Sequence, residues 1–427
     1  MALRFPIIKK ALNLFRKNIF TRVFMENRLM DRSSSVASIN ELVGNEEDKS
    51  LARTGEEICL TKCEDEVFIA NAYRYCSRYL IGNWAKCPPE EFDVHYVSGG
   101  LTNYLYMCSL PNHVSLLENE PRKVLIRIYG SIVDRKQRFN EGVVFTLLSE
   151  RGFGPKSYGV FYSGRIEEYI PHRHLYTREL ADPEISKMIA NKTGHFHCMK
   201  LPLNKQPVFL WESFEKFLSM CNDIKFESDK NQNLYEALMK DFDFHKEYDW
   251  LRTMLIQLNS PVVFCHNDLQ EGNILYIKED KKTDITLIDY DYSSYNYRGF
   301  DFGNHFCEFM YEYKDEHEDG FRTYHNGYPT KEEQIIFASE YLDTLTQIKN
   351  KILPGESNTD KTCATIHICS VEELLHEANR FALASHLFWA LWSIIQAHVS
   401  KIDFNYLKYA RVRMETYKEQ KKQLDYE

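Results

Sequence analysis

The sequence predicts an α+β fold of two lobes, a small β-rich N-lobe followed by a larger α-rich C-lobe. Short alternating apolar segments, broken by glycine or proline, fill much of residues 92–170, which is typical of strands joined by tight turns. From residue 182 onward, apolar residues recur at helical spacing. A polar loop with a strand pair at 262–289 interrupts that helical part. With 427 residues the chain is long enough to build both lobes.

Composition and charge exclude several classes of protein. The net charge of −9 gives no support to a nucleic-acid partner. The 11 cysteines form no C-x-x-C pair, so reduced thiols and a cytoplasmic location are expected. The most apolar stretch, residues 381–399, is predicted to be a buried helix and not a membrane span, because it contains Ser385, His386, Gln396 and His398.

Residues 1–57 differ from the rest of the chain. Residues 1–25 carry basic and apolar side chains without an acidic one, a pattern that is typical of a basic amphipathic helix. That pattern is compatible with a mitochondrial transit peptide, with weak contact to an anionic membrane surface, or with a disordered tail. Residues 31–57 are polar and serine-bearing and predict a linker. The predicted N-lobe therefore covers residues 58–171 and the predicted C-lobe 172–427.

The elements of each lobe follow from periodicity and from turn residues. In the N-lobe we expect a helix over 64–80, two strands within 92–110 around Gly99-Gly100, a strand at 123–129, a helix at 140–151, and strands at 158–161 and 165–170. In the C-lobe we expect helices at 182–197, 209–220, 234–258, 331–350, 370–399 and 404–420. Ser370 and Glu373 form a possible capping box at the start of the long helix.

The polar loop at 262–289 contains the motif that carries chemistry. Asp268 ends the triplet H-N-D, Asn273 follows at the spacing D-x4-N, and the strand-like run I-T-L-I-D ends in Asp289. This spacing is typical of a kinase catalytic loop. A positioned carboxylate can take the proton of a substrate hydroxyl, and amide and carboxylate oxygens suit Mg²⁺. The motif predicts Asp268 as the base and Asn273 and Asp289 as metal ligands.

A second aspartate competes for the metal site. Asp301-Phe302-Gly303 spells the D-F-G of protein kinases, but it follows polar residues and not an apolar strand. Asp289 is therefore the predicted ligand. Asp301 is predicted to brace the catalytic loop by accepting hydrogen bonds from backbone N–H groups.

The N-lobe offers two features that could meet a phosphate. The turn at Gly99-Gly100, with Thr102 and Asn103, could cover phosphate oxygens, although paired glycines also mark plain hairpins. Arg127 lies in the apolar strand V-L-I-R-I-Y, where a charged residue either faces solvent or meets a phosphate. We expect Arg127 to pair with a helix glutamate, either Glu141 or Glu150. The run at 195–198, H-F-H-C, is predicted to pack in a helix and not to bind a metal.

Aromatic residues gather in the last third of the chain. Trp389 and Trp392 are three residues apart on a predicted helix and share a face. Spacing alone favours a place in the core, yet rings of Trp and Tyr also bind quaternary ammonium ions through cation–π attraction. Further aromatic residues are Phe404, Tyr406 and Tyr409 on the next segment, and Tyr311 and Tyr313 after the Asp301 region.

The chain resembles the choline/ethanolamine kinase family from about residue 70 to its C-terminus. The matching strings are S-G-G-L-T-N at 98–103, V-L-I-R-I-Y-G at 124–130, E-Y-I-P-H-R-H at 168–174, F-C-H-N-D-L-Q-E-G-N-I-L at 264–275, the block at 287–308, and N-R-F-A-L-A-S-H-L-F-W-A-L-W-S-I at 379–394. The resemblance implies a protein-kinase-like fold. It also implies phosphorylation of choline to phosphocholine with ATP and Mg²⁺, the first step of the CDP-choline route to phosphatidylcholine. It also implies a homodimer.

The resemblance also implies roles for individual residues. Asp268 is then the base, and Asn273 and Asp289 hold the metal. The nucleotide-contacting positions are Gly99, Gly100, Leu101, Thr102, Asn103, Tyr104, Leu105, Arg127, Glu168, Ile170, Gln270 and Asp289. The aromatic choline pocket falls on Tyr311, Trp389, Trp392, Tyr406 and Tyr409. The segment 168–174 departs from the family pattern at two positions. It has Glu168 and His172 where other polar or basic residues are expected.

Ethanolamine is the alternative substrate, because both branches of the family share the fold and many aromatic residues. Q-E-G between Asp268 and Asn273 and R-G-F after Tyr297 favour the choline branch. An alternative of a different class is an aminoglycoside-type kinase or a protein kinase. The missing A-P-E motif disfavours a protein kinase. A scaffold without activity is disfavoured because the base and both metal ligands are present.

Overall fold

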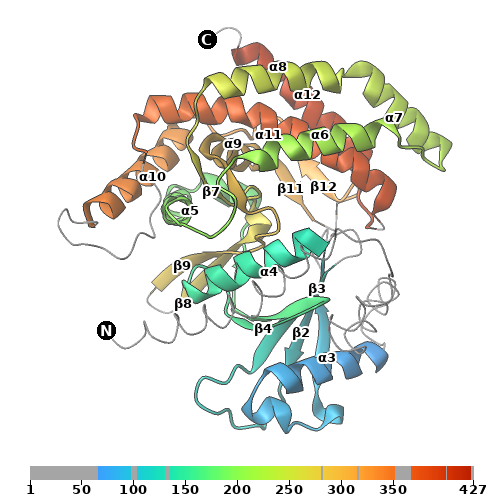
Figure 1. The fold of residues 1–427 in the computed structure, drawn as a ribbon, viewed down its shortest axis with the longest axis vertical. Coiled ribbons are helices and arrows are strands. Elements are labelled where there is room, and N and C mark those ends of the chain that lie inside the picture. The colour runs from blue at the N-terminus through green and yellow to red at the C-terminus, as the bar shows by residue number, and fades with distance from the viewer. Residues whose placement is uncertain are drawn as a thin grey trace, which may run out of the picture. The chain divides into compact units, whose positions relative to one another are not determined.

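The computed structural model describes residues 66–97, 103–129, 135–279, 282–314, 317–351, 367–400 and 402–424 (Figure 1). The predicted tail and linker, and the glycine turn at 98–102, lie outside the described residues. Within the described ranges, no helix is long and apolar enough to span a membrane.

The N-terminal part is built on one antiparallel sheet of five strands in the order β1-β2-β3-β5-β4. Helix α3 (Glu66–Tyr79) packs on this sheet through Phe68, Ala72 and Tyr75, which recur at helical spacing and join a core with Ile126 and Ile166. The strands are β1 (Asp93–Val97), β2 (Asn103–Ser109), β3 (Lys123–Tyr129), β4 (Ser157–Phe161) and β5 (Gly164–Glu168).

Helix α4 (Arg135–Glu150) connects the sheet with the rest of the fold. Its Val144, Phe145 and Leu148 are buried in a core that also contains Phe264 and Tyr290 from the region of the predicted catalytic loop. The sheet and the catalytic loop therefore share a packed boundary at α4, which Figure 1 shows between them.

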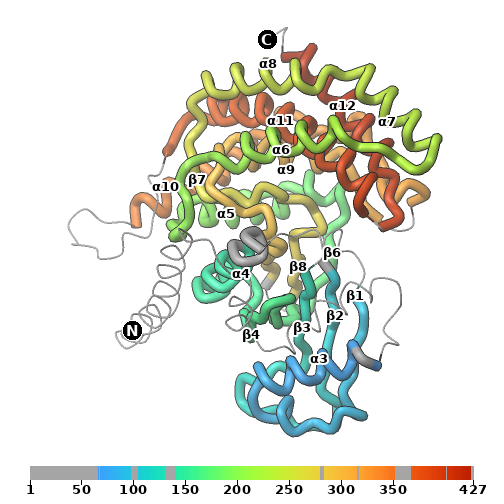
Figure 2. The backbone as a smooth tube through the Cα atoms, turned by 45° about the vertical axis from the view of Figure 1, so that its right-hand side comes forward, coloured from blue at the N-terminus to red at the C-terminus, as the bar shows by residue number. Residues whose placement is uncertain are grey.

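Helices dominate the remainder of the chain. Helix α11 (Val371–Val399) packs against α6, α9 and α12, and Figure 2 shows it running among them. The predicted capping box is confirmed, since Ser370 accepts from Glu373 N and Glu373 reaches back to Ser370 N. The helices are α5 (Pro183–His197), α6 (Val208–Asn222), α7 (Asp229–Asp241), α8 (Phe244–Gln257), α9 (Arg298–Glu308), α10 (Lys331–Lys351), α11 and α12 (Tyr406–Leu424).

Short strand pairs carry the loops of the predicted site. Strand β7 (Val262–Cys265) pairs with β10 (Ser294–Tyr297), and β11 (Tyr311–Tyr313) pairs with β12 (Phe321–Thr323). A further sheet has three strands in the order β6-β8-β9, which are β6 (Arg173–His174), β8 (Ile274–Glu279) and β9 (Lys282–Leu287). The catalytic loop thus runs from β7 to β8, and Asp289 follows β9.

One predicted helix was wrong, and one helix was missed. The helix expected at 234–258 is two helices, because Asp243 caps α8 by accepting a hydrogen bond from Lys246 N at 3.1 Å. Helix α9 was not predicted, because it has only 11 residues, contains Gly299 and Gly303, and directly follows the polar loop. At Gly303 a side chain would meet the backbone of Ala382 at 2.4 Å. The glycine of D-F-G therefore allows α9 and α11 to approach closely.

Candidate active site

Asp301 holds the catalytic loop by accepting hydrogen bonds from its backbone. The two oxygens of its carboxylate accept hydrogen bonds from His266 N at 2.7 Å and Asn267 N at 2.5 Å. His197 on α5 lies 3.0 Å from the same carboxylate and steadies it. The brace predicted from the sequence is confirmed, and the run at 195–198 serves it through His197. Asn267 adopts φ of 67°, a left-handed conformation that asparagine tolerates.

Asp268 and Asn273 form one unit within the loop. The amide nitrogen of Asn273 donates to the backbone oxygen of Asp268 at 2.8 Å and to its Oδ2 at 3.0 Å. Since the amide nitrogen is used in this way, the amide oxygen of Asn273 stays available as a ligand. Burial raises the pKa of Asp268 to about 8, and the carboxylates of Glu308 and Asp289 add to this shift.

Asp289 is joined to the catalytic loop through its neighbour. Ile288 N donates to the backbone oxygen of Asn273 at 3.0 Å, and His266 Nε2 lies 2.9 Å from the oxygen of Ile288. These bonds bring Asp289 to the same side as Asn273. Burial alone would raise the pKa of Asp289, but the charge of Arg127, a hydrogen bond with Asp291 and the charge of Arg165 together lower that pKa. Asp289 is therefore ionised at neutral pH.

Arg127 reaches across from the sheet to this loop. Its Nη1 lies 3.3 Å from Asp289 Oδ2, and its Nε donates to Glu167 Oε1 at 2.8 Å. The expected pairing with Glu141 or Glu150 was wrong, because Glu141 binds Arg165 and Glu150 is exposed. The register between β3 and β5 explains why Arg127 has a different glutamate partner.

Arg127 on β3 lies opposite Arg165 on β5, so both guanidinium groups are on one face of the sheet. Glu167 follows Arg165 by two residues and returns to that face, where its Oε1 accepts from both arginines, at 2.8 and 3.0 Å. A glutamate on the adjacent strand thus takes the place that we expected a helix glutamate to fill.

The remaining predicted nucleotide residues are spread along the sheet and the loop. Gly99, Gly100, Leu101 and Thr102 lie outside the described residues, as does the side chain of Asn103. Tyr104 and Leu105 lie on β2, and Leu105 is the cross-strand neighbour of Arg127.

Glu168, whose carboxylate departs from the family pattern, is held by Lys156. Its Oε2 accepts from Lys156 N at 3.0 Å, and its Oε1 lies 3.3 Å from Lys156 Nζ. Ile170 follows two residues later, and its backbone oxygen lies 2.7 Å from the Nδ1 of His172. Gln270 accepts a hydrogen bond from Gly272 N at 2.6 Å and so shapes the turn between Asp268 and Asn273.

One group of aromatic residues borders the base. Ring centroids of Trp389 and Trp392 are 5.4 Å apart, and the ring of Tyr292 lies 5.4 Å from Trp389. Tyr406 lies 6.0 Å from Trp392 on the far side. Burial raises the pKa of Tyr292, and the nearby charge of Asp268 raises it further. Tyr292, which was not predicted, therefore contacts Trp389 and lies within electrostatic range of the base.

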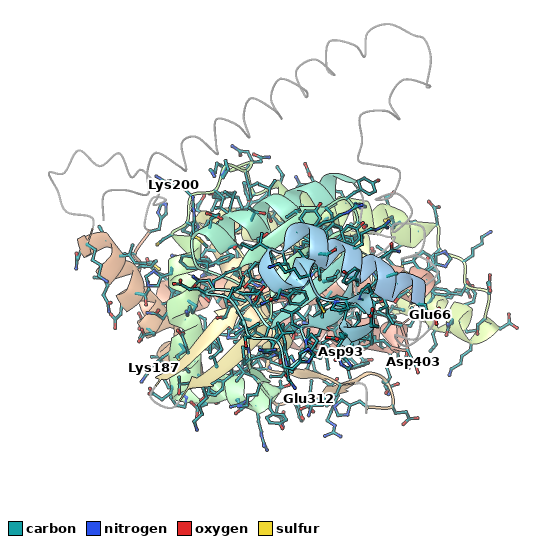
Figure 3. All side chains as sticks on the ribbon, turned by 90° about the horizontal axis from the view of Figure 1, so that it is seen from below. Glu66, Asp93, Lys187, Lys200, Glu312 and Asp403 are labelled. Carbon is teal, nitrogen blue, oxygen red and sulfur yellow. The ribbon has the colours of Figure 1, made fainter. Side chains whose placement is uncertain are left out.

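A second group surrounds Arg413 on α12. Tyr311 is fully buried, and the guanidinium carbon of Arg413 lies 4.1 Å from the centre of its ring. Tyr409 accepts from Arg413 Nε at 2.8 Å, and its hydroxyl lies 2.6 Å from that of Tyr313. Tyr311 thus has a cation from its own chain on its ring, whereas Tyr313 on the same strand is only half-buried. Figure 3 labels Glu312, which lies between these two tyrosines on β11.

Helix α9 brings together one residue that the sequence predicted, Asp301, and two that it did not, Asn304 and Glu308. Asp301, Asn304 and Glu308 have the spacing i, i+3, i+7 and therefore share one face. Asp301 holds the loop, Asn304 accepts from Trp389 Nε1 at 2.7 Å, and Glu308 raises the pKa of Asp268 more than any other charged group does. If residues 298–308 had been predicted to be a helix, this polar face would have indicated these residues.

Asn273 and Asp289 suit a divalent metal ion. They offer one neutral and one anionic oxygen, which is the hard donor chemistry that Mg²⁺ prefers. Their mutual position is set by backbone bonds and not by a contact between their side chains. The residues present therefore fit the metal that the motif predicts.

Comparison with known proteins agrees with this arrangement. The family model for choline/ethanolamine kinases matches residues 94–418. The chain belongs to the choline/ethanolamine kinase family. A rat choline/ethanolamine kinase is 45% identical over 355 residues, covering 83% of this chain and 86% of the rat protein. Mouse choline kinase alpha is 41% identical over 377 residues, covering 83% and 81% of the two chains.

The fold of this member of the choline/ethanolamine kinase family is also similar to that of a solved structure. Choline kinase from Cryptosporidium parvum superposes with a TM-score of 0.63 at 27% identity, covering 83% of this chain and 96% of that chain. The two-lobed, protein-kinase-like fold that the sequence predicts is confirmed.

Proposed function

We propose that the chain is a choline kinase that transfers the γ-phosphoryl group of ATP to the hydroxyl of choline. The products are phosphocholine and ADP, and phosphocholine formation is the first step of the CDP-choline route. The observation that carries the proposal is the place of Asp268. Its carboxylate is within electrostatic range of Tyr292, whose ring contacts Trp389, and of Asp289, which Arg127 contacts from the sheet.

Asp268 accepts the proton of the choline hydroxyl as the new O–P bond forms. Its environment favours the protonated form, which makes the ionised carboxylate a stronger base than an exposed aspartate. The hydrogen bonds from Asn273 to the backbone oxygen and to the Oδ2 of Asp268 keep this residue and its carboxylate in place. Positioning of this kind supplies much of the rate in phosphoryl transfer, because the reaction demands little covalent chemistry from the protein.

Asn273 and Asp289 are the residues that would hold Mg²⁺, which neutralises charge on the ATP phosphates when it is bound. Arg127 complements them from the sheet. Its guanidinium is kept in position by Glu167, so that it points toward Asp289 and the phosphate side of the site. A planar guanidinium binds phosphate oxygens in pairs, which a lysine in this place could not do.

The choline headgroup is placed against ring faces. A trimethylammonium group has no N–H to donate and is stabilised by aromatic faces, on the order of 1–2 kcal/mol for a desolvated contact. Trp389, Trp392, Tyr406, Tyr409 and Tyr311 remain the proposed wall, and the structure adds Tyr292 and Tyr313 as candidates. Tyr311 is fully buried, and its ring lies against the guanidinium of Arg413. It therefore supports the wall and does not offer choline a free ring face.

A direct assay tests the proposal. Purified protein is incubated with Mg²⁺, ATP and choline, and release of ADP is followed together with formation of phosphocholine. Choline-dependent release that disappears in Asp268→Asn supports the proposal. Release of ADP that is the same with and without choline would contradict it.

A further inference from the structure

Two arginines face each other inside the antiparallel sheet. Arg127 on β3 is the cross-strand partner of Arg165 on β5, and both side chains are buried. Like charges that lie directly opposite in a sheet repel one another, and a buried charge is costly unless it is paired. This arrangement therefore depends on the carboxylates that bind the two guanidinium groups.

Glu167 supplies the carboxylate that the two arginines share. A single oxygen, Oε1, accepts from Arg127 Nε at 2.8 Å and from Arg165 Nε at 3.0 Å. The two guanidinium groups compete for this acceptor, so the position of each depends on how firmly the other is held elsewhere. Arg127 is held elsewhere by Asp289, and Arg165 is held by helix α4.

Helix α4 holds Arg165 with two side chains that are one turn apart. Glu141 Oε1 forms an ion pair with Arg165 Nη1, and the guanidinium carbon of Arg165 lies 4.2 Å from the centre of the Phe145 ring. Glu141 and Phe145 have the spacing i, i+4 and share one face of α4. An ion pair and a cation–π contact thus attach this guanidinium to the helix.

The contacts form one continuous chain from α4 to the proposed metal ligand. Carboxylates and guanidinium groups alternate along it, in the order Glu141, Arg165, Glu167, Arg127 and Asp289. The side chain of Asp289 is 27% exposed, whereas those of the other four are at most 9% exposed. Water and salt therefore screen the inner four charges weakly, so that a change in one of them acts on the next.

We propose that Arg165 is a positioning residue for Arg127, through which α4 sets the place of the guanidinium that meets the ATP phosphates. This inference rests on the proposed kinase activity and on the role of Arg127 in it. While Glu141 holds Arg165, the shared oxygen of Glu167 stays available to Arg127. Loss of the Glu141 charge turns Arg165 toward Glu167 and displaces Arg127. The affinity for nucleotide then falls, although neither Glu141 nor Arg165 is among the proposed nucleotide or metal residues.

A double-mutant cycle tests this connection. Glu141→Gln removes the charge that holds Arg165 at similar volume, and Arg165→Lys keeps a charge that cannot bind Glu141 and Glu167 together. Each change is made alone and together with Arg127→Lys, because effects at independent sites add whereas effects along one chain of contacts do not. Glu150→Gln is the matched control, since Glu150 is an exposed residue on the same helix.

The main readout is the Kd of a non-hydrolysable ATP analogue at saturating Mg²⁺, measured by titration calorimetry. The KM for choline is measured beside it, and a melting curve shows which variants are folded. We expect the Kd to rise about fivefold in Glu141→Gln and in Arg165→Lys, with little change in the KM for choline. Neither change should raise the Kd further in the Arg127→Lys background, and Glu150→Gln should match the wild type. If Arg165→Lys does not fold, Glu141→Gln provides the test.

Three results would overturn the inference and assign Glu141 and Arg165 a purely structural role. They are an unchanged Kd in the folded variants, losses that add to that of Arg127→Lys, and an equal rise in the KM for choline. A Kd that higher Mg²⁺ restores would place the effect at the metal and would also overturn it. Wild-type protein that binds the analogue without phosphorylating choline would instead overturn the proposed function.

Discussion

The guanidinium of Arg127 lies 3.3 Å from the carboxylate of Asp289, which connects the antiparallel sheet to the loop that follows β9. Glu167 fixes the other side of the same guanidinium at 2.8 Å. Because a carboxylate on each side restrains it, Arg127 is positioned before any nucleotide binds. The proposed phosphate-binding group and the proposed metal ligand are thus already in contact.

Arg127→Lys tests this preorganisation. Lysine keeps the charge but cannot reach Glu167 and Asp289 together with a planar group. We expect the KM for ATP to rise about tenfold, with a much smaller change in the KM for choline. Steady-state kinetics with each substrate varied in turn provide the measurement. A rise in the KM for choline as large as that for ATP would show that Arg127 is not specific to the nucleotide.

Asp268→Asn should separate catalysis from stability. Loss of a positioned base is expected to lower kcat by about a hundredfold or more. Burial raises the pKa of Asp268 to about 8, so the folded protein favours the neutral form, which asparagine resembles. The melting temperature at pH 8 should therefore stay the same or rise. Near-normal turnover would remove Asp268 from the role of base.

Asp289→Ala and Asp301→Ala should fail in different ways. Asp289→Ala is expected to abolish Mg²⁺-dependent activity with little loss of folding stability, because its side chain is partly exposed. Asp301→Ala leaves the N–H groups of His266 and Asn267 without acceptors, which should cost about 3 kcal/mol or more in the free energy of unfolding. Urea unfolding and Mg²⁺ titration of activity separate the two effects. Reversed phenotypes would mean that the metal ligand is Asp301.

His305 should make stability depend on pH. Burial lowers its pKa to about 4, although its Nδ1 bonds the backbone oxygen of Leu269 at 3.0 Å. An unfolded histidine takes up a proton near pH 6.5, so stability is lost as the pH falls from about 6.5 to about 4. Between pH 7 and pH 5 the loss should be about 2 kcal/mol.

His305→Asn keeps a donor for Leu269 and removes the titration. Its free energy of unfolding, measured by urea denaturation, should fall less than that of the wild type between pH 7 and pH 5. His325→Asn, which alters an exposed histidine, should behave as the wild type does. Parallel pH dependence in the wild type and His305→Asn would show that His305 is not the group responsible.

Local patterns were sufficient for much of the fold. Strand β3 has the bounds predicted, and the H-N-D motif with Asn273 and Asp289 lies in the loops where the sequence placed it, because strand alternation and turn residues are local properties. Partners across the sheet were not predictable in the same way. The choice of Glu167 over Glu141 depends on the register between β3 and β5, which the sequence does not encode locally.

The aromatic residues show the same limit. The spacing of Trp389 and Trp392 predicts a shared helix face, which their ring separation of 5.4 Å bears out. It does not reveal that Arg413 lies on the ring of Tyr311, nor that Glu308 joins Arg413 to Tyr313. Those contacts join α9, β11 and α12, so they became visible only once these elements had been brought together.

A competition experiment tests the choline kinase assignment most directly. Equal concentrations of choline and ethanolamine are offered to the purified protein with Mg²⁺ and ATP, and the two phosphorylated products are resolved by ³¹P NMR. We predict that phosphocholine is the main product. A mixture in which phosphoethanolamine predominates, or one that contains neither product, would contradict the assignment.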